Sequence, residues 1–144
     1  SNTAVGSQSM KCALGYNSTA IGKQTLVNLR NGKTTAVGNY ALYSNTYGSH
    51  NAAVGYNSLS RNTTGYNNTA IGSYAGYYNT TGSNNTFVGK SSGNCNTSGQ
   101  SNTFIGYLSG QCGVTGRNNV FIGDCSGQKN GGQNNIQEAL EMRC

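Results

Sequence analysis

Few side chains in this chain could take part in acid–base or metal chemistry. The 144 residues include only Asp124, Glu138 and Glu141 as acids and His50 as the one histidine. Cleavage of a polysaccharide needs paired carboxylates or a metal site, but Asp124 precedes the tail that holds both glutamates, so no acid pair is expected on one face. One histidine gives little basis for a metal site or a nucleophilic triad. The sequence therefore predicts no enzymatic activity and no cofactor or metal, with His50 as a solvated loop residue.

The chain has five cysteines and no close Cys-x-x-Cys pair, which argues against a zinc site. Cys95 and Cys112 occupy the same position in successive copies of an internal repeat. If each repeat forms one coil of a stack, their Cα atoms lie about 5 Å apart, within the range that a disulfide allows. A disulfide and a stacked pair of free thiols both fit this spacing.

Six asparagines occupy Asn-x-Ser/Thr sequons, the acceptor motif for N-glycosylation. They are Asn17, Asn62, Asn67, Asn79, Asn84 and Asn96. Asn62, Asn79 and Asn96 share one position of the repeat, and Asn67 and Asn84 share another. If the source glycosylates its secreted proteins, these positions predict ladders of sugar. If it is bacterial or phage, they are asparagine ladders and turn residues, which is the interpretation that we favour.

An internal repeat positions these side chains. A block close to Asn/Ser-x-Thr-[Ala/Phe]-[Val/Ile]-Gly recurs in steps of sixteen or seventeen residues, and we call its Ala or Phe the anchor. The anchors are Ala4, Ala20, Ala36, Ala53, Ala70, Phe87, Phe104 and Phe121. A unit of this length suits one coil of a β-solenoid, in which each coil pairs in parallel with the next. The sequence thus predicts an all-β parallel solenoid of about eight coils, stacked about 4.8 Å apart in a rod roughly 40 Å long.

A second glycine punctuates each repeat, eleven or twelve residues after the anchor. The set is Gly15, Gly32, Gly48, Gly65, Gly82, Gly99 and Gly116. Together with the glycine that ends the block, it predicts two points per coil where the backbone turns through φ > 0. Each coil is therefore expected to run as strand, turn, short strand and turn.

Each predicted strand has two adjacent apolar positions, the anchor and the Val or Ile that follows it. We call the residues that share one position in successive repeats a rank. Because neighbouring residues of a strand point to opposite faces, we expect the Val/Ile rank to line the interior and the anchors to face outward. Phe87, Phe104 and Phe121 would then form an aromatic stripe typical of an interface. The reverse register is the alternative, and in either case apolar residues on both faces favour cover by another chain. The predicted self-association or core positions are Phe87, Phe104, Phe121, Ala36, Ala53 and Ala70.

A change in side-chain volume links the anchors to a second rank. Six residues beyond the anchors the sequence reads Met10, Leu26, Leu42, Leu59, Gly76, Gly93, Gly110 and Gly127. This rank becomes glycine in the repeat of Ala70, immediately before the anchor becomes Phe87. Packed interiors tolerate substitutions that conserve volume, so the two ranks are predicted to touch, across one coil or across a chain interface.

The composition of the chain limits the kinds of partner that it is expected to bind. Only 34% of residues are hydrophobic and 8% are charged, so a thick core is not expected. The net charge is +6, but the basic residues are spread thinly, which does not favour nucleic-acid binding. No apolar run approaches the roughly 20 residues needed to cross a bilayer, so no membrane insertion is expected in this segment.

The C-terminal tail departs from the repeat. Its last nine residues, IQEALEMRC, are good helix formers, and Asn134 or Asn135 could cap such a helix. We therefore divide the chain into a solenoid domain, residues 1–133, and a short helical cap or start of a stalk, residues 134–144. Such a cap would cover the open end of the solenoid.

The blocks NSTAIG (17–22), NNTAIG (67–72) and NNTFVG (84–89) resemble repeats of known surface proteins. They are similar to the head repeats of trimeric autotransporter adhesins, and more similar to Asn-Thr-Ala-Ile/Val-Gly repeats of tail-fibre-like proteins of phages, bacteria and large DNA viruses. The resemblance covers roughly residues 1–135. It implies a left-handed β-roll, three chains side by side, and projection from a cell or virion surface, although the unit is longer than the typical adhesin repeat.

These observations predict a non-catalytic fibre or adhesin segment in an extracellular, cell-surface or virion-surface location. Its partners would be copies of itself and ligands of the host surface or extracellular matrix, such as surface glycans or matrix proteins. A structural subunit of a filament assembled end to end is the alternative. An ice-binding solenoid is a third interpretation, based on Thr63, Thr80 and Thr97, but this rank lapses in the early repeats.

Overall fold

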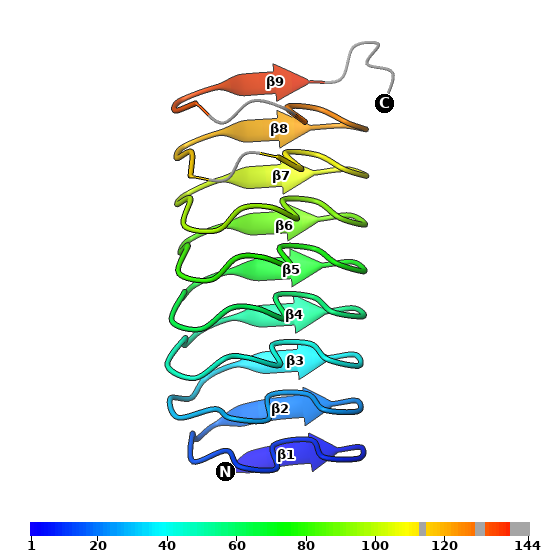
Figure 1. The fold of residues 1–144 in the computed structure, drawn as a ribbon, viewed down its shortest axis with the longest axis vertical. Coiled ribbons are helices and arrows are strands. Elements are labelled where there is room, and N and C mark those ends of the chain that lie inside the picture. The colour runs from blue at the N-terminus through cyan, green and yellow to red at the C-terminus, as the bar shows by residue number, and fades with distance from the viewer. Residues whose placement is uncertain (113–114, 129–131, 139–144) are drawn as a thin grey trace.

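In the described part of the chain nine short strands form one parallel sheet in chain order, so these residues form an all-β parallel solenoid, as predicted. The computed structural model describes residues 1–112, 115–128 and 132–138. Figure 1 shows the strands stacked one above another along the rod, with the connecting segments completing each coil. The strands are β1 (Asn2–Val5), β2 (Ser18–Ile21), β3 (Thr35–Val37), β4 (Ala52–Val54), β5 (Thr69–Ile71), β6 (Thr86–Val88), β7 (Thr103–Ile105), β8 (Val120–Ile122) and β9 (Ile136–Glu138).

The repeated block sets the register of the sheet. Each anchor lies beside the next, as Ala70 beside Phe87 between β5 and β6. The connecting segments also pair from coil to coil: the amide of Tyr74 donates to the carbonyl of Tyr56 (2.9 Å), and that of Thr63 to the carbonyl of Thr80 (2.9 Å). Each coil is thus hydrogen-bonded to its neighbours in the turns as well as in the strands.

From Ala20 onward the anchors lie inside the rod, and the Val/Ile rank faces outward. Ala70 and Phe87 are 0% exposed, whereas Val54 and Ile71 are 41% and 46% exposed. The expected register is therefore wrong and its alternative is found. Both ranks are apolar, so alternation could not distinguish them; the anchors are inside because they pack against the leucine rank, which includes Leu59. The aromatic rank is core rather than an exposed stripe.

Phe87 fills space that two glycines leave open. A Cβ atom on Gly76 would lie 2.5 Å from Cδ2 of Phe87, and one on Gly93 would overlap the other edge of the same ring. The predicted contact between the two ranks is thus confirmed, and it lies within one chain. Because the ring spans its own coil and the one before, Gly76 must precede Phe87 by one coil. The ring of Phe104 stacks at 4.9 Å on that of Phe121.

Backbone conformation also favours glycine in this rank. Leu59 has φ +48° and Gly76 has φ +58°, so both occupy the left-handed region. A non-glycine residue in that region costs about 1 to 2 kcal/mol. In the later coils glycine avoids this cost, while a phenylalanine anchor supplies the missing volume from the strand.

The two glycines of each repeat have different reasons for being glycine. Gly72, which ends its block, has φ +132°, as predicted. Gly65, of the second set, has no such conformation; a Cβ atom there would collide with the carbonyl oxygen of Gly82 and with Oδ1 of Asn62. The prediction of φ > 0 is therefore wrong for the second set, where close packing of neighbouring coils excludes a side chain.

Buried asparagines form a ladder through the middle coils. Asn45, Asn62, Asn79 and Asn96 are all 0% exposed. Each Nδ2 donates to Oδ1 of the asparagine one coil earlier, from Asn62 to Asn45 (2.7 Å), Asn79 to Asn62 (3.1 Å) and Asn96 to Asn79 (2.8 Å). The Oδ1 of Asn96 has no hydrogen-bond partner among the described residues. The ladder supplies polar interior contacts that compensate for the small apolar core.

A second ladder runs beside the strands. Its members are Asn51, Asn68, Asn85, Asn102, Asn119 and Asn135, and the Oδ1 of each of the first five accepts the backbone amide of the next. The Nδ2 of Asn85 also donates to the carbonyl of Gly99 (2.8 Å). These side chains therefore tie the turn of one coil to the strand of the next.

The C-terminal tail continues the sheet where a helix was expected. Ile136–Glu138 forms β9, with Gln137 beside Phe121 of β8. No helix occurs in the described residues, so the predicted helical cap is wrong for 136–138, and residues 139–144 of that prediction lie outside the described residues. Parallel pairing with β8 outweighs the helix propensity of this short segment, because a helix of this length is marginal without tertiary support.

Candidate functional site

The outer face of the sheet carries a regular array of threonine and aliphatic side chains, which we call the Thr/Val face. It consists of the residues on either side of each anchor in β2–β8. The aliphatic members are Ile21, Val37, Val54, Ile71, Val88, Ile105 and Ile122, and the threonines are Thr19, Thr35, Thr69, Thr86 and Thr103, with Ala52 and Val120 in the remaining places. Five of these aliphatic residues are 37 to 46% exposed. No charged residue occupies either rank in β2–β8, so the face is apolar with hydroxyl groups at fixed intervals.

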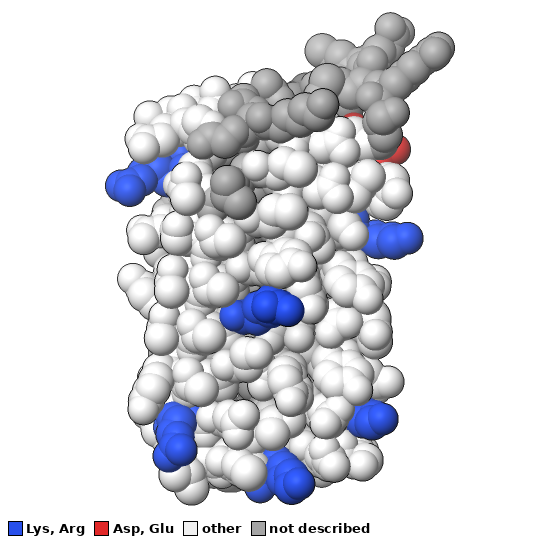
Figure 2. Space-filling view, in the orientation of Figure 1, with Lys and Arg blue, Asp and Glu red and all other residues white. Residues whose placement is uncertain are grey.

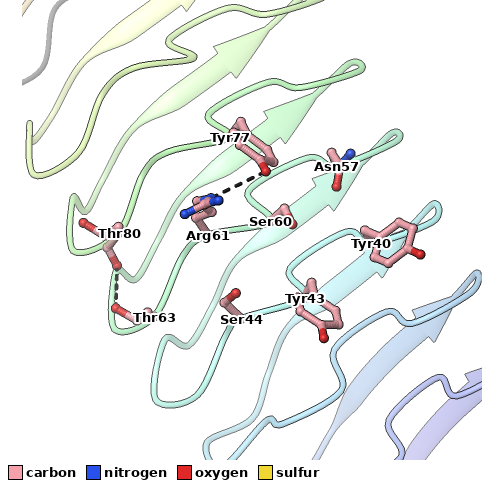
Figure 3. A pocket seen from close by; sticks show the side chains of 9 residues that line it. All are labelled: Tyr40, Tyr43, Ser44, Asn57, Ser60, Arg61, Thr63, Tyr77 and Thr80. Carbon is pink, nitrogen blue, oxygen red and sulfur yellow. Dashed lines mark hydrogen bonds between the residues drawn. The ribbon is translucent and has the colours of Figure 1, made fainter.

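A second surface lies on the segments that follow β3, β4 and β5, and we call it the tyrosine–arginine groove. It is a hollow of ≈ 530 Å³, shown in Figure 3. Its lining residues are Tyr40, Tyr43, Ser44, Asn57, Ser60, Arg61, Thr63, Tyr77 and Thr80. Aromatic rings, one cation and several hydroxyl groups therefore meet in one open site.

A small residue between two tyrosines creates the groove. Tyr43, Ser60 and Tyr77 occupy the same position in three successive coils, seven residues after their anchors. The two tyrosines are thus two coil spacings apart, roughly 10 Å, and between them the rank contributes only the hydroxymethyl group of Ser60. This Tyr-x16-Ser-x16-Tyr pattern was readable in the sequence, but we did not identify it there because the repeat was compared at its anchors and glycines.

Arg61 is held over aromatic rings. Its Nε donates to the hydroxyl of Tyr77 (3.5 Å), and its guanidinium carbon lies 5.6 Å from the ring centre of Tyr77 and 5.2 Å from that of Tyr78. The hydrogen bond with Tyr77 raises the pKa of Arg61, and no carboxylate contributes to that shift. Arg61 is therefore a permanently charged group that is positioned by aromatic contacts rather than by an ion pair.

Edge-to-face contacts join the tyrosines around the groove. Ring centres of Tyr56 and Tyr74 are 5.4 Å apart at 79°, and those of Tyr40 and Tyr56 are 6.3 Å apart at 88°. A hydrogen bond with Tyr74 raises the pKa of Tyr56. A phenol hydroxyl can both donate and accept a hydrogen bond, so the rings bring polar groups as well as apolar surface to this region.

Cys95 and Cys112 are free thiols, and Cys12 is also free. The structure thus has the pair as thiols, and the disulfide that the repeat spacing allows stays a prediction. Burial and the neighbouring Cys112 raise the pKa of Cys95. At neutral pH Cys95 is thus mostly a protonated thiol and a poor nucleophile.

The six sequon asparagines divide into two groups. Asn62, Asn79 and Asn96 are fully buried and their Nδ2 atoms donate within the ladder, so a glycan on any of them is incompatible with the folded rod. The other three, Asn17, Asn67 and Asn84, are exposed. Nδ2 of Asn67 donates to Oδ1 of Asn84 (3.1 Å), which places these two in a surface ladder.

The remaining candidate residues do not come together. His50 is exposed, and its Nδ1 lies 3.2 Å from the hydroxyl of the neighbouring Ser49. Within residues 1–112, 115–128 and 132–138 no cluster of His, Cys, Asp and Glu could hold a metal ion. The Thr63 and Thr80 hydroxyls donate to the carbonyls of Thr80 (3.0 Å) and Thr97 (3.0 Å), so this threonine rank serves coil-to-coil bonding.

Comparisons with known proteins returned no match to a family model, a curated protein or a solved structure. In the described part of the chain no helix is long and apolar enough to cross a membrane.

Proposed function

We propose that this chain is a non-catalytic segment of a surface fibre or adhesin, in which three copies lie side by side with their Thr/Val faces together. The observation that carries the proposal is the exposed aliphatic rank, which runs from β2 to β8 without a charged residue. In a single rod this rank would stay in water, at a cost of about 25 cal/mol per Å² of apolar surface left unburied. Lateral packing of copies removes that surface from water.

The repeat favours association between copies of the same chain. Every coil presents the same pair of ranks in the same register, so two rods that match at one coil match at the next. Interactions that are weak per coil therefore add along the rod. The handedness and the number of three chains come from the resemblance to adhesin and tail-fibre repeats, together with an extracellular or virion-surface location.

The assembly proposal predicts a loss of mass when charge is placed on the Thr/Val face. We expect the wild-type chain to have about three times its single-chain mass of 15.0 kDa in solution. The double variant Val54→Lys, Ile71→Lys should have the mass of one chain, because two ammonium groups would be buried against a partner without a counter-charge. Sedimentation equilibrium measures both masses.

The control variant Thr64→Lys, Thr81→Lys adds the same charge at two exposed turn positions in nearby coils and should retain the wild-type mass. A wild-type chain that sediments as a monomer would contradict the proposal. Long fibres in negatively stained samples would instead support end-to-end assembly into a filament.

The same face supports a second candidate function, the binding of ice. Its threonine hydroxyls and aliphatic methyl groups form a two-dimensional array, with coils about 4.8 Å apart along the rod and the two ranks roughly 6.6 Å apart across each strand. Such an array could order surface water. This face differs from the Thr63, Thr80 and Thr97 rank that the sequence suggested, whose hydroxyls are engaged internally.

Ice binding predicts thermal hysteresis from a single chain. The wild-type protein should depress the freezing point relative to the melting point, and Thr69→Leu, Thr86→Leu should reduce the gap, because both hydroxyls leave the array. The Thr64→Leu, Thr81→Leu control should not. A trimer without hysteresis would favour the fibre segment and exclude this candidate.

A further inference from the structure

We propose that the tyrosine–arginine groove binds an acidic glycan, with Arg61 pairing with the carboxylate of a uronic or sialic acid residue and the tyrosines packing against sugar rings. The proposal deepens the proposed function, since a fibre or adhesin segment would meet such polymers at a cell surface. The groove and the Thr/Val face are built from different residues, so each can fail without the other.

The charge of the site is the first argument. Arg61 is exposed, and its pKa is raised by the hydrogen bond with Tyr77 rather than by a carboxylate. The sequence contains a single acid, Asp124, before residue 138, and Asp124 lies four coils further along the rod. A guanidinium without a carboxylate partner retains its paired N–H donors for a planar anion, and a carboxylate matches that geometry.

The aromatic residues are the second argument. Tyr43 is 37% exposed and Tyr78 is 41% exposed, although both take part in ring contacts. The C–H groups on one face of a sugar ring are apolar and pack on such rings, while its hydroxyl groups need polar partners at the edge. Ser60 lies between Tyr43 and Tyr77, which occupy the same position of the repeat two coils apart. Its small side chain leaves room for one ring-shaped ligand between them.

Hydroxyl and amide groups around the hollow are the third argument. Ser44, Asn57 and Ser60 line it beside the tyrosines (Figure 3). Such side chains both donate and accept hydrogen bonds, as sugar hydroxyls do. An apolar peptide would leave these groups without partners, whereas a saccharide can satisfy them.

The surface outside the groove does not favour a general polyanion. Figure 2 shows Lys and Arg side chains scattered singly over one face rather than gathered in a patch. Binding of a nucleic acid draws its affinity from many phosphate contacts along a basic surface. One positioned cation in an aromatic hollow suits a ligand with one carboxylate at a defined place.

Two matched pairs of saccharides test the proposal by isothermal titration calorimetry on the full chain. A hyaluronan tetrasaccharide carries uronate groups that a chitotetraose lacks, and 3′-sialyllactose carries a carboxylate that lactose lacks. We expect at least one acidic member to bind about tenfold more tightly than its neutral partner, a difference in affinity equal to about 1.4 kcal/mol. The arm that responds identifies uronate or sialate as the source of the carboxylate.

Variants locate the site. Arg61→Gln should abolish the preference for the acidic saccharide, and Tyr43→Ala should weaken binding of both members of the pair. Lys90→Gln is the matched control, because Lys90 lies 5.8 Å from the ring centre of Tyr107 and its loss changes the net charge equally. It should leave binding unchanged.

Three results would overturn the proposal: equal affinity for acidic and neutral saccharides, no binding of any of the four, or an equal loss from Lys90→Gln and Arg61→Gln. Tighter binding of an oligo-dT strand than of either acidic saccharide would assign the groove to nucleic acid instead. Because the Val54→Lys, Ile71→Lys variant leaves the groove residues in place, its failure to assemble would not remove saccharide binding per chain.

Discussion

Replacement of Phe87 by alanine is expected to lower the free energy of unfolding by about 3 to 5 kcal/mol, the usual cost of emptying a buried aromatic site. The ring is 0% exposed and lies between the two glycines of its neighbouring rank. The surrounding backbone is fixed by hydrogen bonds to the coils on both sides, so the cavity cannot collapse. Urea denaturation followed by circular dichroism measures the change.

A leucine placed at position 76 should rescue this variant. Gly76→Leu alone is expected to cost about 1 to 3 kcal/mol or more, because its Cβ would overlap the Phe87 ring. With Phe87→Ala the ring is gone, and the new leucine can lie on Leu59 in the arrangement of the earlier coils, whose leucines already occupy left-handed φ. The double variant should therefore be more stable than the sum of the single effects predicts, by about 2 kcal/mol.

Tyr66→Ala provides the control for loss of an aromatic ring, since Tyr66 is 49% exposed, and it should change the free energy of unfolding by less than about 0.5 kcal/mol. Simple additivity of Phe87→Ala and Gly76→Leu would show that the two positions do not compete for one space.

Replacement of Asn79 by alanine is expected to lower the free energy of unfolding by about 2 to 4 kcal/mol, because buried groups lose hydrogen-bond partners. Nδ2 of Asn79 donates to Oδ1 of Asn62 and to the carbonyl of Gly82 (2.9 Å), and its Oδ1 accepts from Asn96. The substitution leaves Oδ1 of Asn62 buried without its donor from the next coil. Thermal and urea denaturation measure the effect.

Asn28→Ala is the matched control, because Asn28 is exposed and its side chain is outside both ladders. It should alter the free energy of unfolding by less than about 0.5 kcal/mol. Equal effects of the two substitutions would mean that the ladder contributes no more than a surface amide.

The period of the repeat predicted the fold because it depends on spacing alone. A nearly constant step places identical blocks beside one another, and the observed register pairs Ala53 with Ala70 and Ala70 with Phe87 as expected. Volume exchange between Gly76 and Phe87 was also predictable, since it requires only that two ranks touch. These features follow from comparison of one coil with the next.

The direction in which each side chain points was not predictable from the same comparison. The anchor and the Val/Ile residue after it are both apolar, so alternation alone permits either face. The face to which the anchors point is decided by the leucine rank that includes Leu59, which lies across the coil from them. The position of that rank depends on residues with left-handed backbone conformation, such as Leu59 itself and Asn57, at φ +48° and +56°. Leucine gives no sequence signal for that conformation, which is normally associated with glycine.

The tyrosine–arginine groove was missed for a related reason. It arises at a position whose residue type varies from coil to coil, with Ser60 between Tyr43 and Tyr77, and such a position carries no repeat signal. Residues 136–138 were mispredicted because the composition of their segment favours a helix, whereas the exposed edge of β8 offers hydrogen bonds that a strand alone can use.

The ladder of buried asparagines gives the rod a chemical polarity. The amide groups of Asn62, Asn79 and Asn96 each donate to the asparagine one coil nearer the N-terminus. The side-chain oxygen of each coil is therefore an acceptor for the following coil, and that of Asn96, at the end of the ladder, has no donor among the described residues. A growing chain is made from its N-terminus, so every finished coil presents acceptors to the segment synthesised after it. The rod can therefore assemble in the order of translation, with each completed coil as the template for its successor.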